Sequence, residues 1–473
     1  MDIDITGEIK RFDYRLKTLV LGLGSSGYSC MEFLTTKNCP FDICDTRPVP
    51  PNIEKLRKEF PQQNVRCEPI TIELLEQYQQ VIVSPGISIR QSAFSAYLAL
   101  DRLLIGDVEL FAQELSSLHE LNDCQTKVVA ITGSNGKSTV TTMVEHIAQQ
   151  AGLKALAGGN LGLPVLDMLK TEVDIYVLEL SSFQLETLYS LTTESAVVLN
   201  ISEDHMDRYD DLMDYQAVKE KIYRNCRIKV LNLDEPLSEK YQHDDENSRL
   251  GFTMNKPQQG QFGLIENGRE IYLVKAEDQV NINIMSSQEL KVKGRHNIAN
   301  ALAAMALLNS WKIPTNILRA ALKSYKGLPH RCEWVREVNG VTFFNDSKGT
   351  NVGATIAAIN GFDEDLILIA GGQGKGADFR ELAVVVRESI KTVLLFGEDA
   401  KLIDIAITES GSDGEPVLEV MQVENLHQAV NLAYEYAQPG MNVLFSPACA
   451  SFDQYKNFIE RGEDFIKWVK ALE

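Results

Sequence analysis

The sequence ITGSNGKST, residues 131–139, combines the residue types that bind a nucleoside triphosphate. An apolar run precedes it and apolar residues at helical spacing follow it, which predicts a strand, a glycine loop and a helix. The glycines let main-chain N–H groups turn inward, the helix start adds partial positive charge, and Lys137 adds a full charge. The hydroxyl of Ser138 or Thr139 suits Mg²⁺. The residues expected to contact the phosphates are Gly133, Ser134, Asn135, Gly136, Lys137, Ser138 and Thr139.

This loop differs from the common phosphate loop in its spacing. Two residues separate Gly133 from Gly136, where the usual pattern has four. A short Gly-x-x-Gly-Lys-Ser pattern also arises by chance. Its position between a predicted strand and an amphipathic helix is what favours a triphosphate site.

Two further polar groups follow apolar runs in this part of the chain. Glu179 comes after residues 174–178, and the segment from Asn200 to His205 comes after residues 196–199. Ligands bind at the carboxyl ends of the strands of an open parallel sheet, so Glu179, His205 and the glycine loop are expected to face one crevice. A carboxylate and an imidazole beside a triphosphate are plausible Mg²⁺ ligands. The plainer alternatives are that Glu179 caps a helix and that His205 is a surface or core residue.

The N-terminal part of the chain holds another glycine pattern, Gly22-x-Gly24-x-x-Gly27, after an apolar strand. Asp45 ends the next predicted strand 18 residues later. This spacing fits the fingerprint of a dinucleotide site, and it makes a nicotinamide-dependent dehydrogenase the serious alternative from another class. The same geometry holds any diphosphate.

Strands alternate with helices along the chain, which predicts α/β domains with parallel sheets. Strand-to-glycine-loop junctions occur in each third, at residues 19–27, 128–139 and 366–376. They predict a Rossmann-like N-terminal domain, a central ATPase-type domain and a Rossmann-like C-terminal domain, over residues 1–106, 107–328 and 329–473. The polar segment 234–290 is expected to be a surface excursion of short strands inside the central domain.

Composition narrows the classes of partner. The chain has 473 residues and a net charge of −20, from 66 acidic and 46 basic residues, which opposes nucleic acid or an anionic membrane as the main partner. No apolar stretch approaches the length of a membrane span, and the N-terminus lacks a signal-peptide core. Eight cysteines are present without a Cys-x-x-Cys pair. We expect a soluble, cytoplasmic, monomeric protein.

Seven motifs together resemble the Mur ligase family: TGSNGKST, ELSSFQLE, SEDHMDRY, GRHNIANALAA, GLPHRCE, NDSKGTNVGAT and SPACASFDQYKNF. They occur in one order over residues 18–466. Any one motif is modestly specific, whereas all seven in order are very specific. The segment SPACASFDQ is typical of the members that add D-glutamate.

The resemblance implies a reaction that these residues can support. ATP would phosphorylate the carboxylate of UDP-N-acetylmuramoyl-L-alanine, and the amine of D-glutamate would attack the acyl phosphate. Such a step needs charge neutralisation and positioning, which Lys137 and two Mg²⁺ ions would supply. The resemblance also implies that the C-terminal domain closes on the central one and excludes water.

By the same resemblance, one lysine is carbamylated by CO₂ and becomes an oxygen anion that a hard cation prefers. The position implied is Lys219, because Tyr215 lies four residues earlier, as in the family. Lys221 lies two residues further on and could be mistaken for it. The plainer alternative for Lys219 is an exposed helix lysine. The metal ligands implied are Ser138, Glu179, His205 and the carbamylated Lys219.

The resemblance assigns the remaining ligand contacts by position. Those for ATP are Asn300, Arg331 and Asp346. Those for the UDP substrate are Ser25, Ser26, Asp45, Thr46, Arg47, Gly86 and Asn160. Those for D-glutamate are Thr350, Lys375, Ser451, Phe452 and Phe458.

Several of these positions have structural alternatives. Without the resemblance, Asn300 would be interpreted as a helix-surface residue and Asn160 as a turn residue with positive φ. Ser451 fits a capping box before an amphipathic helix, and Phe452 and Phe458 fit a partly buried core. Ser25 and Ser26 depart from the residue types common in the family, so the details of uracil recognition stay open.

Three alternatives to a D-glutamate ligase are carried forward. One is a Mur-type ligase that adds another amino acid. Another is the dehydrogenase that Gly22-x-Gly24-x-x-Gly27 would serve. The third is a non-enzymatic, ATP-gated scaffold, which the SEDHMDRY and NDSK segments disfavour because gating alone does not need so many ionisable groups.

Replacement of Lys137 tests the phosphate loop. Lys137→Ala is expected to fold normally, because the residue faces a crevice, and to lose at least about 100-fold in turnover, as when other charge-stabilising groups are removed. Circular dichroism and ATP-dependent ligation measure both. A folded variant with near-normal ligation would place the triphosphate elsewhere.

Overall fold

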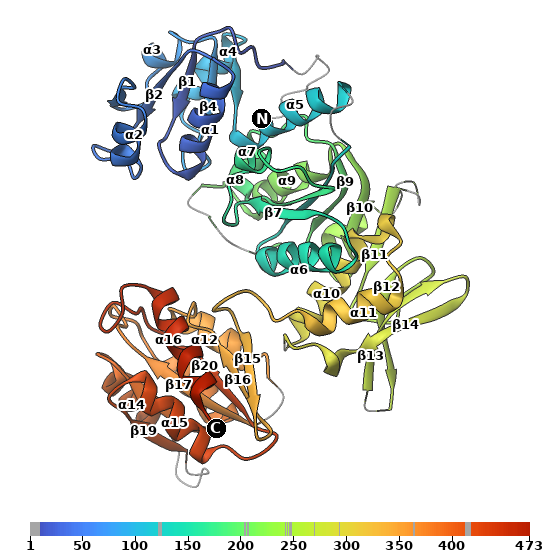
Figure 1. Ribbon diagram of the computed structural model, residues 1–473, viewed down its shortest axis with the longest axis vertical. Helices are drawn as coiled ribbons and strands as arrows, with labels where there is room; N and C mark the ends of the chain where they lie inside the picture. Colours follow the sequence, from blue (N-terminus) through green and yellow to red (C-terminus); the bar gives the residue numbers. More distant parts are fainter. Residues whose placement is uncertain are drawn as a thin grey trace. The chain divides into compact units, whose positions relative to one another are not determined.

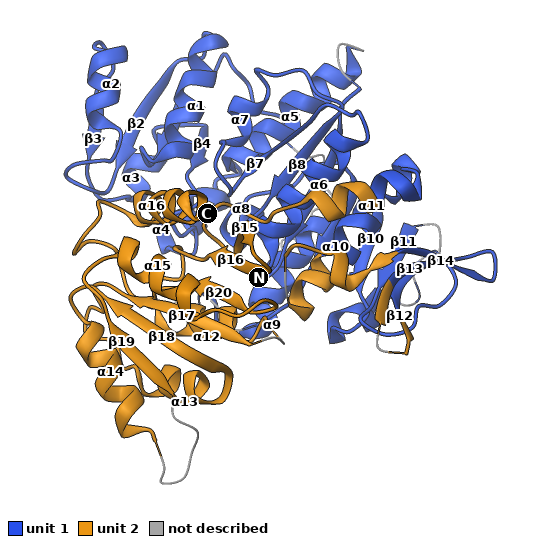
Figure 2. Ribbon diagram, turned by 60° about the horizontal axis from the view of Figure 1, so that its bottom comes forward, with its two compact units in different colours: residues 1–265, 273–284, 301–318 blue, residues 266–272, 285–300, 319–473 orange. Residues whose placement is uncertain are grey.

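The structure is a computed structural model that describes residues 10–121, 125–202, 205, 208–241, 243, 245, 248–268, 270–292, 294–362, 365–411 and 418–473. Contacts within the chain divide it into two compact units (Figure 2). The first runs to Ile265 and includes Leu273–Ile284 and Ala301–Leu318. The second consists of Glu266–Tyr272, Met285–Asn300 and Arg319–Glu473. No helix in the described ranges is long and apolar enough to cross a membrane.

The first unit opens with a five-stranded parallel sheet of order β3-β2-β1-β4-β5. Figure 1 labels β1, β2 and β4 of this sheet. Its strands are β1 (Thr18–Leu21), β2 (Phe41–Asp45), β3 (Val65–Cys67), β4 (Gln80–Val83) and β5 (Leu103–Ile105). Its helices are α1 (Ser25–Thr36), α2 (Ile53–Glu59), α3 (Ile72–Leu75) and α4 (Ser92–Ala99). Strand β1 is buried along its whole length, as its apolar sequence predicts.

A nine-stranded sheet follows, in the order β14-β13-β12-β11-β10-β9-β6-β8-β7. Its strands are β6 (Lys127–Thr132), β7 (Ala155–Gly159), β8 (Ile175–Glu179), β9 (Thr193–Val198), β10 (Cys226–Asn232), β11 (Arg249–Phe252), β12 (Phe262–Asn267), β13 (Glu270–Glu277) and β14 (Val280–Ser286). The helices of this region are α5 (Asp107–Glu120), α6 (Lys137–Gln150), α7 (Val165–Met168), α8 (Ser182–Glu186), α9 (Leu212–Glu220), α10 (Arg295–Leu307) and α11 (Thr315–Ser324). The strands from β7 through β8, β6, β9 and β10 to β11 are all parallel.

The segment 234–290 differs from the expected surface excursion. Its strands β11 to β14 extend the central sheet, and β13 and β14 are 8 and 7 residues long. The two residues between them, Asp278 and Gln279, both have positive φ, which is the geometry of a tight hairpin turn. The segment is polar because these strands lie at one end of the sheet and several of their side chains are exposed.

The second unit contains a six-stranded sheet of order β15-β16-β20-β17-β18-β19. Its strands are β15 (Glu333–Val338), β16 (Val341–Asn345), β17 (Leu366–Gly371), β18 (Ile390–Phe396), β19 (Glu419–Gln422) and β20 (Asn442–Phe445). Its helices are α12 (Val352–Ile359), α13 (Arg380–Ser389), α14 (Ala400–Glu409), α15 (Leu426–Tyr436) and α16 (Phe458–Ala471). Strand β15 is antiparallel to β16, and the other pairs are parallel.

The apolar run of β17 shows why this last sheet is covered on both faces. Leu366 and Leu368 contribute to one apolar cluster, and Ile367 and Ile369 contribute to another. Successive strand residues point to opposite faces, so a continuous apolar run needs two layers of helices. The α/β fold class with parallel-rich sheets is therefore confirmed, whereas the exact limits 1–106, 107–328 and 329–473 stay predictions.

The glycine loop after β1 turns through a close approach of two main-chain segments. Gly22 has a φ of +89°, and a Cβ added to Gly27 would lie 1.8 Å from the carbonyl oxygen of Gly22. No side chain fits there, because the obstacle is main chain and not a flexible side chain. A side chain at residue 27 would therefore push these two main-chain segments apart.

Gly27→Ala is therefore expected to destabilise the N-terminal sheet by roughly 1–3 kcal/mol or more, since overpacking forces the main chain apart. Gly24→Ala is the matched control, because a Cβ there meets nothing within 4 Å. Urea unfolding of both variants measures the difference. Equal stability of the two would show that the loop relaxes without cost.

Candidate active site

The glycine loop lies between β6 and α6, as its sequence predicts. Gly133 and Gly136 both have positive φ, and Gly136 is the N-cap of α6. The Lys137 ammonium folds back and donates to the carbonyl oxygens of Gly133 at 2.7 Å and Ser134 at 2.9 Å. The loop thus presents a helix N-terminus and a lysine at one place, which is the arrangement that binds an anion.

Neighbouring strands bring the expected polar groups to the same edge of the sheet. Ile131 pairs with Glu179 in the register of β6 and β8. Asn200, just beyond β9, accepts from the Ser134 amide at 3.0 Å through its main chain and from the Asn135 amide at 2.8 Å through its side chain. The carboxyl ends of β6, β8 and β9 therefore meet, as expected for a parallel sheet.

Glu179 is buried, with 2% of its surface exposed. Its Oε1 accepts a hydrogen bond from Asn160 Nδ2 at 2.8 Å, whereas its Oε2 is buried without a hydrogen-bond partner among the described residues. Helix α8 is capped by Ser181 in a capping box, so the helix-cap alternative for Glu179 is wrong. Asn160 is also absent from the described residues with positive φ, so it is not a left-handed turn residue.

Lys219 is buried to 1% exposure, so the alternative of an exposed helix lysine is wrong. Its ammonium donates to Gly133 O at 2.9 Å and to Thr132 Oγ1 at 3.4 Å, and it lies 4.6 Å from the centre of the Tyr215 ring. The ammonium groups of Lys137 and Lys219 therefore share one carbonyl oxygen. Two like charges so close in a buried place repel each other.

Lys221 is placed differently. Its ammonium donates to the main-chain oxygen of Glu186 at 3.0 Å. Burial lowers its pKa to about 8. It contacts neither the glycine loop nor Lys219 through any hydrogen bond found among the described residues, so the two lysines of this helical segment have different environments.

His205 is exposed and has a φ of +58°. Its ring lies 4.7 Å from that of Phe183. A positive φ is uncommon for a residue with a side chain and occurs often at functional positions. The core alternative for His205 is wrong, and its role as a ligand stays a prediction.

No three His, Cys, Asp or Glu side chains gather closely enough to hold a metal ion within the described ranges. Mg²⁺ is commonly held by one or two carboxylates together with phosphate oxygens and water. The unpartnered, buried Oε2 of Glu179 suits such a hard cation, and the glycine loop is the place for the phosphates. The residues present therefore fit Mg²⁺ that is bound together with a phosphorylated substrate.

A cavity of about 380 Å³ gathers every residue assigned to the UDP substrate. It is lined by residues of the N-terminal glycine loop, of the segment after β4 and of the segment after β7. Its lining is Gly22, Gly24, Ser25, Ser26, Asp45, Thr46, Arg47, Ser84, Pro85, Gly86, Ile87, Gly159, Asn160 and Gln184. Asn160 lines this cavity and also orients Glu179, so it connects the two.

The carboxylate of Asp45 is occupied by hydrogen bonds from neighbouring loop residues. It accepts from the Leu23 amide at 2.7 Å and from the Arg47 amide and guanidinium at 2.7 to 2.9 Å. Burial raises the pKa of Asp45, but these hydrogen bonds outweigh it and hold the pKa below the usual value. A carboxylate so occupied is poorly placed to bind the ribose of a dinucleotide, which argues against the dehydrogenase.

The residues assigned to ATP outside the glycine loop belong to the second unit. Asn300 is buried and donates to Asn297 Oδ1 at 3.0 Å, so the helix-surface alternative is wrong. Asp346 is buried, and it accepts from Ser446 Oγ at 2.7 Å and from the Cys332 amide at 3.1 Å. Arg331 is exposed.

The residues assigned to D-glutamate come together in part. Gln373 and Ala450 exchange main-chain hydrogen bonds of 2.9 Å, which sets the loop of Lys375 beside that of Ser451. The Lys375 ammonium lies 4.8 Å from the centre of the Phe452 ring.

Two structural alternatives for this group are wrong. Phe452 is 61% exposed, so it is not part of the core, whereas Phe458 is half-buried. Ser451 is buried and does not cap α16, because Asn457 accepts from the Glu460 amide at the start of that helix. Thr350 is half-buried, and its amide donates to Lys348 O at 2.8 Å.

Arg461 is a residue that the sequence reasoning missed. It is fully buried on α16 and donates to Ser347 Oγ, Ser347 O and Cys449 O at 2.9 to 3.1 Å. It joins the segment after β16 to the segment before Ser451. An arginine on the apolar face of an amphipathic helix is the signal that points to it.

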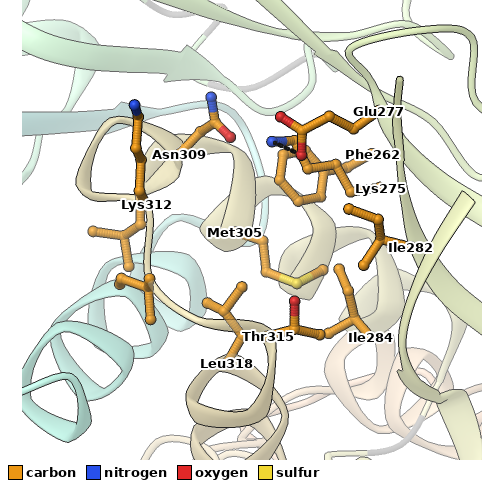
Figure 3. A pocket seen from close by; sticks show the side chains of 12 residues that line it. Phe262, Lys275, Glu277, Ile282, Ile284, Met305, Asn309, Lys312, Thr315 and Leu318 are labelled. Atoms are coloured by element: carbon orange, nitrogen blue, oxygen red, sulfur yellow. Dashed lines mark hydrogen bonds and ion pairs between the residues drawn. The ribbon is translucent and has the colours of Figure 1, made fainter. Parts of the chain in front are cut away.

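A second cavity, of about 370 Å³, lies between β12–β14 and the ends of α10 and α11 (Figure 3). Its lining includes apolar side chains such as Met305 and Ile284 and the ion pair of Lys275 with Glu277, at 3.0 Å. None of the residues assigned to a ligand lines it.

Comparison with known proteins places the chain in a class. Three family profiles match it: Mur ligase MurD-like, N-terminal domain, over residues 16–106; Mur ligase middle domain, over 131–308; and Mur ligase, glutamate ligase domain, over 330–449. The chain belongs to the Mur ligase family, which confirms the resemblance of its motifs.

Individual relatives indicate which kind of Mur ligase the chain is similar to. The chain is 42% identical to UDP-N-acetylmuramoylalanine--D-glutamate ligase of Methylobacillus flagellatus, over 97% of each chain. It is 44% identical to the ligase of that name from Pseudomonas aeruginosa, over 96% of this chain and 98% of the other. The structure of UDP-N-acetylmuramate-alanine ligase from Thermotoga maritima, 17% identical, matches with a TM-score of 0.54 over 97% and 100% of the two chains, which shows a shared fold.

Asp346 gives a testable consequence of burial. Burial raises its pKa to about 6, from an ordinary value near 4. The native state thus holds this proton more tightly than the unfolded state, so the contribution of Asp346 to stability is fully present below about pH 4 and is lost as the pH rises through 6. The free energy of unfolding of wild type, relative to Asp346→Asn, is expected to fall by roughly 2–3 kcal/mol between pH 4 and 7.

Urea unfolding over that range measures the difference. Asp378→Asn is the control in the same unit, because hydrogen bonds from Arg380 lower the pKa of Asp378 to about 2, below the range tested. A difference between wild type and Asp346→Asn that does not change with pH would contradict the raised pKa.

Proposed function

We propose that this chain is an ATP-dependent ligase that adds D-glutamate to UDP-N-acetylmuramoyl-L-alanine in the synthesis of peptidoglycan precursors. The observation that carries the proposal is the full-length identity of 42–44% to curated ligases of that name. The cavity that gathers all seven residues assigned to the UDP substrate supports it. Action as a monomer in the cytoplasm is part of the proposal.

The UDP substrate would lie in the cavity between the N-terminal glycine loop and Asn160. Helix α1 begins at Ser25, so the diphosphate would meet a helix N-terminus. Asp45 and Arg47 hold the loop in shape, and Thr46, Ser26 and Gly86 line the wall. The far end of the substrate would then point toward Asn160 and Glu179.

ATP would place its phosphates on the loop from Gly133 to Thr139. The main-chain N–H groups and the Lys137 ammonium would neutralise charge on the transferred phosphoryl group, which is the main requirement of this step. Asn300, Arg331 and Asp346 are proposed for the remaining ATP contacts. The substrate carboxylate would attack the terminal phosphorus and release ADP, and the D-glutamate amine would then displace phosphate.

Mg²⁺ would supply further charge neutralisation as a Lewis acid when bound. The proposed holders are Glu179, Ser138, His205 and a modified Lys219, for two ions. Glu179 supports this because one of its oxygens is buried and unpartnered, while Asn160 fixes the other.

We propose that Lys219 is carbamylated. Its ammonium would first lose one proton to solvent; the neutral amine would then attack the carbon of CO₂, and loss of a second proton would leave a carbamate. The cation is thereby replaced by an anion. The product keeps an N–H group that can still donate to Gly133 O. The crowding of two ammonium groups on that oxygen supports the change, because it replaces repulsion from Lys137 by attraction.

D-Glutamate would bind between the loops of Lys375 and Ser451. The bridge of Gln373 with Ala450 supports this, since it holds the two loops side by side. Lys375 would pair with the side-chain carboxylate, and Thr350, Phe452 and Phe458 are proposed to complete the pocket.

Phosphate release with ATP, UDP-N-acetylmuramoyl-L-alanine and a panel of amino acids tests the function. Release is expected with D-glutamate and only weakly with L-glutamate, L-alanine or a diamino acid. A preference for another amino acid would make the chain a different Mur ligase. A change in nicotinamide absorbance without any need for ATP would identify a dehydrogenase.

Lys219→Ala is expected to nearly abolish turnover, whereas Lys221→Ala is expected to be mild, because only Lys219 donates to the glycine loop. Acetate should partly restore Lys219→Ala by replacing the missing oxygen anion. Initial rates over a series of acetate concentrations measure this. Equal sensitivity of the two lysines, or no rescue at any concentration, would count against carbamylation.

Lys375→Ala is expected to raise the KM for D-glutamate strongly, because the side-chain carboxylate then lies unpaired, at a penalty of roughly 2–5 kcal/mol. The KM for ATP should move little. Lys391→Ala, an exposed lysine of the same sheet, is the matched control. An unchanged KM for D-glutamate would move the amino-acid site elsewhere.

A further inference from the structure

A buried ion pair lies in the central region of the first unit. Arg208 lies just beyond His205, and Glu186 ends α8; their side chains are 8% and 4% exposed. Arg208 Nε donates to Glu186 Oε1 at 3.2 Å, and its Nη2 contacts Oε2. None of the motif assignments gives either residue a role.

The same guanidinium also holds the wall of the UDP-substrate cavity. Its Nη1 donates to Pro85 O at 2.9 Å, and its Nη2 donates to Ile87 O at 3.3 Å. Pro85, Gly86 and Ile87 all line that cavity. One side chain of the central region therefore fixes the main chain on both sides of Gly86.

The flat face of the Arg208 guanidinium packs on Phe183, which lies next to the candidate metal ligand His205. The guanidinium carbon lies 4.0 Å from the centre of the Phe183 ring. That ring in turn lies 4.7 Å from the ring of His205. A displacement of Arg208 would thus be felt at the cavity wall and at His205.

Arg90 strengthens the connection from the other side. It pairs with Asp214 at 2.6 Å and lies 3.7 Å from Glu186. Its hydrogen bonds to Asp214 hold the pKa of that carboxyl below the usual value. Asp214 is on α9, the helix that carries Lys219. The loop from residue 85 to 90 is therefore held by Arg208, which packs on the same Phe183 ring as His205, and by Asp214 of the helix that carries Lys219.

Stability alone does not explain this arrangement. A buried ion pair often contributes no more to stability than an apolar pair of the same size. Arg208 fixes the relative positions of the groups that it bonds. A guanidinium donates in several fixed directions, so it can hydrogen-bond to a carboxylate and two carbonyls at the same time. A lysine cannot make the same set of bonds.

We propose that Arg208, held by Glu186, is a positioning residue that aligns the UDP-substrate cavity with His205 and α9, and so places the substrate carboxylate for phosphorylation. The proposal rests on the function proposed above. It assigns Arg208 no direct contact with the reacting atoms.

Arg208→Lys is the first test, because it keeps the positive charge beside Glu186 and removes the planar guanidinium with its several fixed donors. We expect the KM for UDP-N-acetylmuramoyl-L-alanine to rise by about tenfold, and the Kd for UDP, measured by calorimetry, to rise by the same factor. That factor corresponds to the loss of one hydrogen bond that involves a charged group. The KM for ATP should stay within about twofold, and hydrogen exchange at residues 84–90 should speed up.

The double variant Arg208→Gln/Glu186→Gln separates positioning from charge burial. It removes both charges, so it is expected to fold even if Arg208→Lys does not, yet to show the same rise in KM and Kd. Arg102→Gln is the matched control, because Arg102 also donates to main-chain carbonyls beside the N-terminal sheet. These are the carbonyls of Glu76 and Tyr78, between α3 and β4, and they do not line the cavity.

Unchanged UDP binding and unchanged exchange at residues 84–90 in the double variant would overturn the proposal. So would an equal rise of both KM values, which indicates general loosening. A wild-type protein that binds UDP but does not ligate D-glutamate would overturn the proposed function instead, and the UDP and exchange measurements would still decide the role of Arg208.

Discussion

The carbonyl oxygen of Gly133 accepts hydrogen bonds from two lysines, Lys137 and Lys219, and the candidate site depends on this shared acceptor. The two ammonium nitrogens lie no farther apart than the sum of their distances to that oxygen. Lys219 is buried, so water screens the repulsion poorly. A negative charge bound beside the two ammonium groups would relieve their mutual repulsion. Phosphate groups on the loop, the free oxygen of Glu179 and a carbamate on Lys219 would each supply it.

The sheet explains why these groups meet. Strands β6, β8 and β9 are parallel neighbours, so their carboxyl ends carry the glycine loop, Glu179 and Asn200 to one edge. Asn160 then links this edge to the UDP-substrate cavity, since it lines the cavity and fixes Glu179. Arg208 makes a second link to that cavity, from the side of Phe183 and His205. In the proposed function, these buried polar contacts would couple the position of the substrate to charge neutralisation.

Much of the fold could be predicted from the sequence because its signals are local. Apolar runs such as 366–371 marked strands buried on both faces, and the glycines of the three loops marked the turns that follow them. The extension of the central sheet by β11 to β14 was not predicted, because exposed strands at the end of a sheet have no continuous apolar run.

The site was predictable only where one segment carries the chemistry. The glycine loop is such a segment, whereas the burial of Lys219 depends on a carbonyl 86 residues away. Arg208 and Pro85 are 123 residues apart, and Arg461 and Ser347 are 114 apart. No periodicity in the sequence reports contacts over such separations. The motif order supplied the assignments, and the structure supplied the reason for several of them.

The most direct test of the account is carbon-13 NMR of the protein in ¹³C-labelled bicarbonate. The crowding of Lys137 and Lys219 on Gly133 O predicts one protein-bound carbamate resonance in wild type and in Lys221→Ala, and none in Lys219→Ala. The same signal should weaken when the solution is depleted of CO₂. A wild-type protein with full ligase activity and no carbamate resonance, or a resonance that persists in Lys219→Ala, would contradict the claim that Lys219 acts as an anion at this site.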